Sequence, residues 1–194
     1  MTALPVPRTW SPGLLSTGDL NIEMRDSLAY LLAPPMATVR KERAPQTLTP
    51  SVPNMGIIEW DMVVADTEGG WQATADNAYT VQVPGLYHVI AQFQAAAETD
   101  VGLFVSRVFY VSKNFAPIWG NGTWQAMLLQ NPPGSSSYSR SYLLTTVIGA
   151  VAGDTLSIHG FPRSTQNTPN FDIVGYDGVN NFGCQWDLRW VSKL

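Results

Sequence analysis

The chain has 194 residues, of which 45% are hydrophobic and 13% are charged, with a formal net charge of −4 at pH 7. This length suffices for one domain with an appendage, and the hydrophobic content supports a sizeable core and excludes a disordered chain. The charged fraction is about half of the usual one, which indicates either a surface covered by other chains or an exterior rich in uncharged polar residues. The basic residues are scattered, apart from Arg40, Lys41 and Arg43, so nucleic-acid binding is excluded for want of a basic face.

The single cysteine and the N-terminal residues bear on the cellular compartment. Cys184 lies in an alternating run and is predicted to be a buried thiol, with no internal disulfide framework. No signal peptide is recognisable, and no stretch approaches the ~20 apolar residues of a membrane span. We therefore expect a protein made in a reducing cytosol that does not insert into a membrane.

The first 35 residues predict an extended arm followed by one short helix. Residues 4–13 contain three prolines and Trp10, which favours an extended conformation. From residue 16 to the Pro34-Pro35 pair, apolar residues recur at three- and four-residue spacing, which predicts a helix with an apolar stripe. The members of this helical stripe are Leu20, Met24, Leu28 and Leu31. A lone helix of this length is marginal in water, so the stripe should dock on another surface.

Strands are predicted from residue 36 onward. A candidate strand at 36–43 precedes a Pro/Thr-rich link that ends near Pro53. In 56–66, alternation is partial and places Ile58, Trp60 and Met62 on one side.

The stretch 78–95, AYTVQVPGLYHVIAQFQA, consists of two alternating runs joined by Pro84-Gly85. This pattern predicts an antiparallel pair with the Pro-Gly step at a corner of a sandwich. The residues expected to face the core are Tyr79, Val81, Val83, Tyr87, Val89, Ala91, Phe93 and Ala95, and those expected on the opposite face are His88, Gln92 and Gln94.

Further strands are predicted at 101–111, 122–130, 138–151, 154–161 and 182–192. Eight to ten short strands without a second helix predict an all-β sandwich or jelly roll.

No pattern of catalytic or metal-binding residues is evident. His88 and His159 lie on separate strands, no His/Cys/Asp cluster has metal-ligand spacing, and no G-x-S-x-G motif occurs. We therefore predict no catalytic residue, no cofactor and no metal ligand.

Two groups of carboxylates leave alternatives open. A pair from the first group could serve glycoside hydrolysis, although solvated loop carboxylates are the simpler interpretation. Oxygen ligands from a loop containing the second group could bind Ca²⁺. The first group is Asp61, Asp66, Glu68 and Asp76, and the second is Asp172 and Asp177.

Two of the seven tryptophans, Trp119 and Trp124, flank an expected turn, 120–122. Their aromatic faces are candidates for surface binding of a sugar or a protein, the alternative being burial in the core or between subunits.

The motif around Pro84 resembles a signature of the C1q/TNF-like jelly roll. In that family a strand ending in V-P-G-x-Y turns into a long alternating strand, and Val83, Pro84, Gly85 and Tyr87 match it here. The later stretches 151–160 (VAGDTLSIHG) and 181–191 (NFGCQWDLRWV) are looser matches in the right order. The resemblance implies a C1q-like domain at 54–194 and assembly into homotrimers through apolar strand faces.

The segment 8–35 is similar to the start of small virion proteins of phages that infect actinobacteria. The shared features are T-W-x-x-G from Thr9, D-L-N-x-x-[IM]-R-D-x-L from Asp19, and a Leu-rich end with a proline pair. Several such proteins, usually described as minor tail or head-fibre proteins, have a C1q-like domain behind this leader.

Together the two resemblances imply a non-enzymatic structural protein of a tailed-phage virion, namely a homotrimeric minor tail or fibre protein with an adhesive β domain. Residues 1–35 would be the virion attachment segment, with Trp10, Leu20, Met24, Leu28 and Leu31 in contact with tail or capsid proteins. Residues 36–53 would be a linker with a strand, and the β domain would face outward. The alternatives are a capsid decoration or head-fibre protein, and a lectin-like or envelope-degrading protein that contacts host cell-surface glycan.

Overall fold

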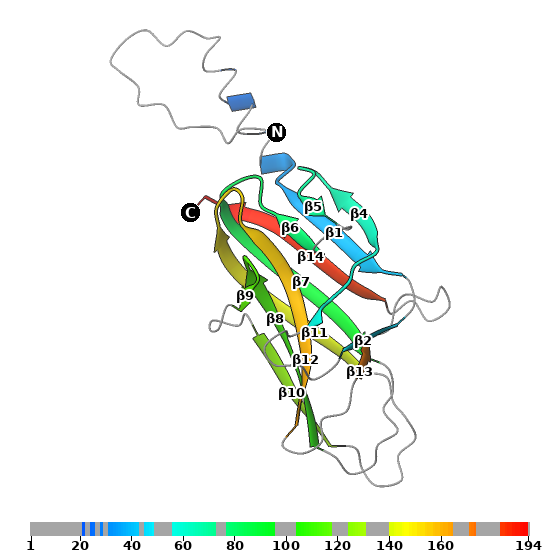
Figure 1. Ribbon diagram of the computed structural model, residues 1–194. Helices are drawn as coiled ribbons and strands as arrows, with labels where there is room; N and C mark the ends of the chain where they lie inside the picture. The colour runs from blue at the N-terminus through cyan, green and yellow to red at the C-terminus, as the bar shows by residue number, and fades with distance from the viewer. Residues whose placement is uncertain are drawn as a thin grey trace.

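The computed structural model describes residues 31–42, 45–48, 56–72, 77–95, 104–117, 124–130, 140–164, 171–173 and 183–193, together with Asn21, Met24, Arg25 and Leu28. These residues form two facing β-sheets, A and B (Figure 1). Every strand pair among them is antiparallel. The prediction of an all-β, two-sheet fold is confirmed for this part of the chain.

Sheet A begins with edge strand β4 and continues through β1, β14 and β7 to β11, and the short strands β13 and β2 extend it beside β7. Its strands are β4 (Met62–Asp66), β1 (Met36–Lys41), β14 (Cys184–Ser192), β7 (Gly85–Ala95), β11 (Arg140–Ala150), β13 (Phe171–Ile173) and β2 (Gln46–Leu48).

Sheet B runs from β5 through β6, β12 and β8 to β10, with β3 beside β12 and β9 beside β8. Its strands are β5 (Trp71–Gln72), β6 (Ala78–Thr80), β12 (Thr155–Ser164), β8 (Phe104–Lys113), β10 (Trp124–Gln130), β3 (Gly56–Ile57) and β9 (Ala116–Pro117). Six of the fourteen described strands have two or three residues; of these, β3 and β6 lie within predicted strands, and the other four are too short for alternation to reveal them. The eight longer strands match the predicted number.

The core lies between the two sheets and follows the predicted alternation. On β7, Tyr87, Val89, Ala91 and Phe93 are fully buried, whereas the intervening residues are partly or largely exposed. Phe93 stacks on Phe109 of β8 with the ring centroids 4.2 Å apart, which joins the two sheets through aromatic packing.

The Pro-Gly step is a corner, but the two runs that it joins are not an antiparallel pair. The strand β6 pairs with β5 and β12 in sheet B, while β7 pairs with β11, β13 and β14 in sheet A. The predicted pairing is therefore wrong, because the chain crosses between the sheets at residues 81–84. The Tyr87 hydroxyl donates to Val83 O at 2.5 Å, and Trp190 Nε1 donates to Pro84 O at 3.2 Å. These hydrogen bonds hold the corner against β7 and β14.

The segment 36–53, expected as a linker with a possible strand at 36–43, contributes β1, which confirms that strand, and β2 to sheet A. Strand β1 lies between β14 and β4, with Ala37 and Val39 in the core, so the described sandwich begins at Met36. Of the three residues expected on one side of 56–66, Ile58 and Trp60 are buried, but Met62 is exposed. Met62 lies on edge strand β4, whose register against β1 shifts between Thr38 and Val39, and the alternation is lost there.

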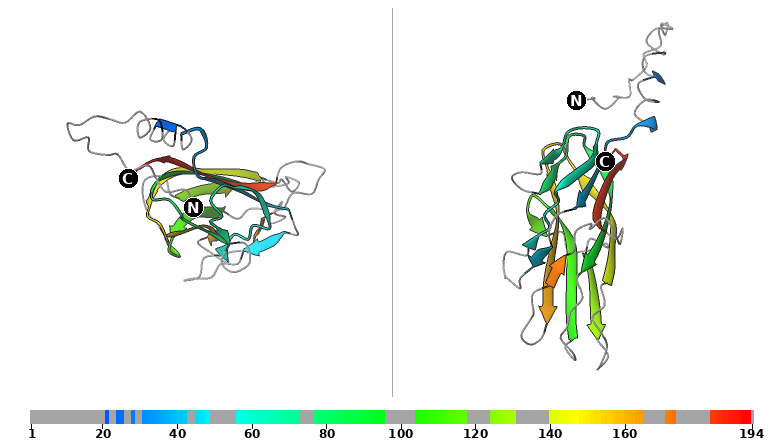
Figure 2. Two further views of the ribbon diagram at one scale, coloured as in Figure 1. Left: turned by 90° about the horizontal axis from the view of Figure 1, so that it is seen from above. Right: turned by 90° about the vertical axis from the view of Figure 1, so that its right-hand side faces the viewer.

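The described residues of the predicted helix lie beyond the end of the sandwich at which the C-terminal strand β14 also ends (Figure 2). Asn21, Met24, Arg25, Leu28, Leu31 and Leu32 have helical conformation. The remainder of the arm and helix lies outside the described residues, so the full helix stays a prediction. Within the described part, no helix is long and apolar enough to cross a membrane.

Candidate interaction surfaces

A row of hydrogen-bonded polar side chains crosses the outer face of sheet A from β1 to β14. Thr38 Oγ1 donates to Asp187 Oδ1 at 2.7 Å, and Gln185 Nε2 donates to Asp187 Oδ2 at 2.8 Å. Arg40 Nε in turn donates to Gln185 Oε1 at 2.9 Å. The guanidinium and the carboxylate are thus linked through an amide, and each of the four side chains is held in one orientation.

Next to this row, the outer face along β7 and β11 is partly apolar. Leu143 is 52% exposed and Val147 is 53% exposed, and they alternate with the hydroxyl residue Thr145. Val147 is the cross-strand partner of His88, and His88 Nε2 shares a 3.0 Å hydrogen bond with Thr145 Oγ1. Such a mixture of apolar and hydrogen-bonded side chains is typical of protein–protein interfaces.

The helical stripe is the second apolar surface. Met24, Leu28 and Leu31 are 55%, 52% and 69% exposed, and the adjacent Leu32 is 83% exposed. Large apolar side chains on one helical face, exposed to this degree, are expected to be covered by a partner. Trp10 and Leu20, the other predicted attachment residues, lie outside the described residues.

The two predicted surface tryptophans are not brought into one described site. Trp124 is the first residue of β10, and its backbone is the partner of Tyr110 in β8. Trp119 lies outside the described residues, so the binding role of this pair stays a prediction.

The histidine in sheet B is a packed structural residue. His159 is buried, stacks on Tyr110 with the ring centroids 5.1 Å apart, and has its Nε2 3.0 Å from Ser157 Oγ. A serine beside a histidine resembles a nucleophile with its base. Ser157 is buried as well, however, and its Oγ lies 2.6 Å from Ser112 Oγ, which leaves no access for a substrate.

The carboxylates considered for catalysis bind backbone amides. Asp66 accepts hydrogen bonds from the N–H groups of Gly69 at 2.9 Å and Trp71 at 2.8 Å, and Asp61 accepts one from Glu42 N at 2.6 Å. Asp66 therefore stabilises the turn that follows β4, and Asp61 links the residue before β4 to the residue after β1. Among the residues that the structure describes, no three His, Cys, Asp or Glu side chains are grouped to hold a metal ion. Asp76 and Asp177 lie outside those residues, and Asp172 is described only as backbone in β13.

The predicted buried thiol is confirmed, whereas one member of the basic cluster lies unexpectedly in the interior. Cys184 is fully buried as predicted, and burial raises the pKa of its thiol to about 11. Lys41 of the basic cluster is buried too, with Nζ 3.4 Å from Glu59 O, while Arg40 faces outward into the polar row. The polar row could not be found from the sequence, because Thr38 and Asp187 are 149 positions apart.

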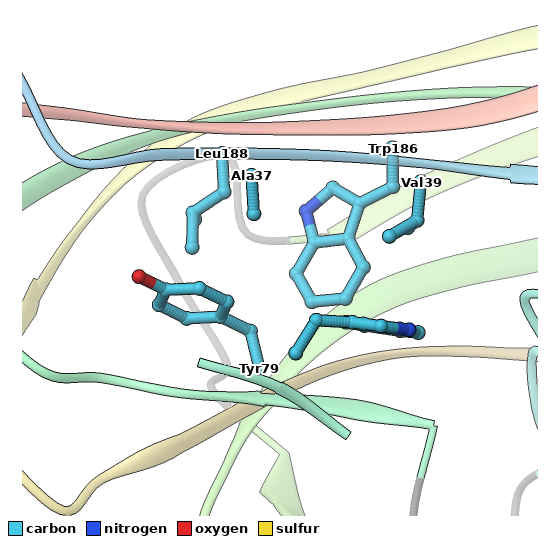
Figure 3. A pocket seen from close by; sticks show the side chains of 6 residues that line it. Ala37, Val39, Tyr79, Trp186 and Leu188 are labelled. Atoms are coloured by element: carbon cyan, nitrogen blue, oxygen red, sulfur yellow. The ribbon is translucent and has the colours of Figure 1, made fainter. Parts of the chain in front are cut away.

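A small apolar cavity lies between the sheets near Trp186 (Figure 3). It is too narrow to hold a water molecule and is lined by Ala37, Val39, Trp71, Tyr79, Trp186 and Leu188. The indole nitrogen of Trp186 faces Leu188 across this space (Figure 3). Among the described residues, no acceptor lies within hydrogen-bond distance of the buried indole N–H groups of Trp60, Trp71 and Trp186. The cavity is thus part of the aromatic core.

Comparisons with known proteins show the fold. No family model matches the chain, and no curated protein matches it. Among the solved structures that match is the globular domain of zebrafish complement 1qA protein, with a TM-score of 0.53 and 13% sequence identity. The match covers 82% of this chain and 99% of that one. The chain therefore has a C1q-like, jelly-roll type β fold, as the motif around Pro84 predicts.

Proposed function

We propose that the chain is a non-enzymatic structural protein on the exterior of a tailed-phage virion. It forms a homotrimer that attaches through residues 1–35 and presents the β domain outward as a minor tail or fibre protein. The proposal is supported most directly by one combination, a leader of the phage virion type in front of a C1q-like fold.

The homotrimer is supported by the outer face of sheet A. Leu143 and Val147 present apolar area beside an ordered polar row, and a C1q-like fold is one that commonly assembles into trimers. Threefold packing through this face would cover the exposed apolar side chains and would account for part of the low charge of the chain.

The outward orientation is supported by the position of the chain ends. The described helical residues and the end of β14 lie at one end of the sandwich, while the ends of β7, β8 and β10 that border 96–103 and 131–139 lie at the other (Figures 1 and 2). Attachment through residues 1–35 would therefore direct the far end away from the virion, where loops carry binding functions.

Immunogold electron microscopy of the purified phage, with antibody raised against residues 54–194, tests the location. Gold at the tail is the expected result. Gold over the head would instead assign the chain to capsid decoration or head fibres. An antibody that recognises the native protein and labels no particle would contradict the virion proposal.

A further inference from the structure

We infer that the exposed stripe of the N-terminal helix is covered by the same stripe of the other two copies, in a short parallel three-helix bundle above the sandwich. This inference rests on the proposed homotrimer and gives the stripe a partner within it. The remaining arm, with Trp10, would then be the part of the leader left to contact the virion.

The spacing of the described apolar residues fits a helix seam. With Leu28 at position a of a heptad, Met24 and Leu31 occupy d positions and Leu32 an e position. Leu32 widens the stripe beyond a strict a/d seam in the second heptad, which suits packing against two neighbouring helices, whereas the e position of the first heptad is Arg25. Asn21 falls at the preceding a position, where a polar residue specifies register and the number of strands.

The β-sandwich of the same chain does not cover these side chains. Met24, Leu28, Leu31 and Leu32 are all more than half exposed, and the helical residues lie beyond the end of the two sheets (Figure 2). The connection is short and stiff, because only Ala33 and the Pro34-Pro35 pair separate Leu32 from β1.

The base of the helix is fixed to the sheet that carries the proposed trimer face. Trp190 N of β14 donates to Pro35 O at 2.8 Å, and Met36 N donates to Thr67 Oγ1 at 2.9 Å. Three sandwiches packed through the outer face of sheet A would therefore hold three helix bases at the same end of the assembly. Cyclic symmetry makes these helices parallel. Two heptads are marginal alone, but tethering supplies the high effective concentration that a short bundle needs.

Disulfide trapping in the full-length protein tests this arrangement. Seam residues of a bundle have Cα atoms within the reach of a disulfide, below about 7 Å, whereas flanking residues point apart. We expect Leu28→Cys to give disulfide-linked dimers on mild oxidation at least about tenfold faster than the matched control Asp26→Cys, which falls at position f of the preceding heptad, opposite the stripe. Cys184 does not interfere, because it is buried.

The outcomes separate the inference from the proposed function. Light scattering of the unmodified protein reports the trimer itself, and a monomer would overturn both. A trimer in which Leu28→Cys and Asp26→Cys cross-link at equal rates would overturn the helix bundle alone. A Leu28→Cys thiol that reacts with maleimide in the free trimer but is protected in the virion would assign the stripe to a virion protein and would also overturn the bundle. Rapid cross-linking in the trimer, independent of protein concentration, supports it.

Discussion

The corner at Gly85 gives the sharpest test of the fold. A Cβ atom added to Gly85 would overlap Nε1 of Trp190 and would lie 2.5 Å from Ser192 O and 2.7 Å from Trp190 Cδ1. Two of these atoms belong to an indole that donates to Pro84 O, and the third is backbone of β14. Gly85→Ala must therefore displace Trp190 or the end of β14.

The loss of stability expected for Gly85→Ala is the sum of three contributions. Overpacking by one methyl group costs about 1–3 kcal/mol, and loss of the indole hydrogen bond adds about 1 kcal/mol. The lower entropy of the unfolded alanine chain offsets about 0.4–1 kcal/mol. Gly85 has no positive φ, so backbone strain adds nothing. The free energy of unfolding should fall by about 2 kcal/mol or more, which corresponds to a midpoint shift of about 1 M urea.

Equilibrium unfolding in urea at fixed protein concentration measures the effect. Gly69→Ala is the matched control, since Gly69 has φ +67° and no atom within 4 Å of an added Cβ, so it loses only about 1 kcal/mol from backbone strain. In a double-mutant cycle, Trp190→Ala should lower the cost of Gly85→Ala. A Gly85→Ala variant as stable as the parent, or more stable than Gly69→Ala, would refute this account of the corner.

Three further predictions concern charge, burial and assembly. Asp154→Asn should lower the free energy of unfolding by about 1 kcal/mol at pH 7, because the hydrogen bond from the Val151 N–H, at 2.9 Å, holds the pKa of Asp154 below its ordinary value. This contribution to the free energy of unfolding is complete above the pKa of Asp154 in the unfolded chain, near 3.9, and is lost as the pH falls through its lower pKa in the folded protein. Urea titrations should therefore show a smaller loss of stability for the variant at pH 3 than at pH 7. Equal losses at the two pH values would contradict the prediction. Cys184, with a pKa raised to about 11 by burial, should react with a thiol reagent at pH 8 about 100-fold more slowly in the folded protein than in urea, and similar rates would disprove its burial. Val147→Asp should convert the trimer to monomers in light scattering, whereas Val64→Asp on edge strand β4 should not, and a trimeric Val147→Asp variant would exclude this face.

The strands could be predicted because each long one records its environment in its own alternation. Tyr87, Val89, Ala91 and Phe93 are buried as their spacing indicates, and the Pro84-Gly85 step marks a change of direction. Which strands pair could not be predicted, because pairing depends on partners far away in the chain. The corner motif therefore suggested a local hairpin where the chain crosses between sheets.

The candidate surfaces likewise differ in whether a local sequence pattern could predict them. The helical stripe was visible as a local period, and its exposure at Met24, Leu28 and Leu31 accords with a need for a partner. The polar row depends on Thr38 lying opposite Asp187, a long-range pairing that no local pattern contains. The burial of Lys41 was likewise hidden, since a cluster of charges normally indicates a solvated face.

Strand β11 explains why composition alone left two interpretations of the low charge open. Its run YLLTTVI places apolar residues on both faces, and only the fold separates the buried Leu144 and Ile148 from the exposed Leu143 and Val147. On the outer face each exposed apolar side chain alternates with a hydroxyl residue such as Thr145, so uncharged polar groups and apolar groups share the surface. A surface covered by other chains and an exterior rich in uncharged polar residues are therefore not exclusive interpretations of the low charge. The polar groups of such a face are hydrated in a single chain, and its apolar side chains are removed from water when a second copy covers them.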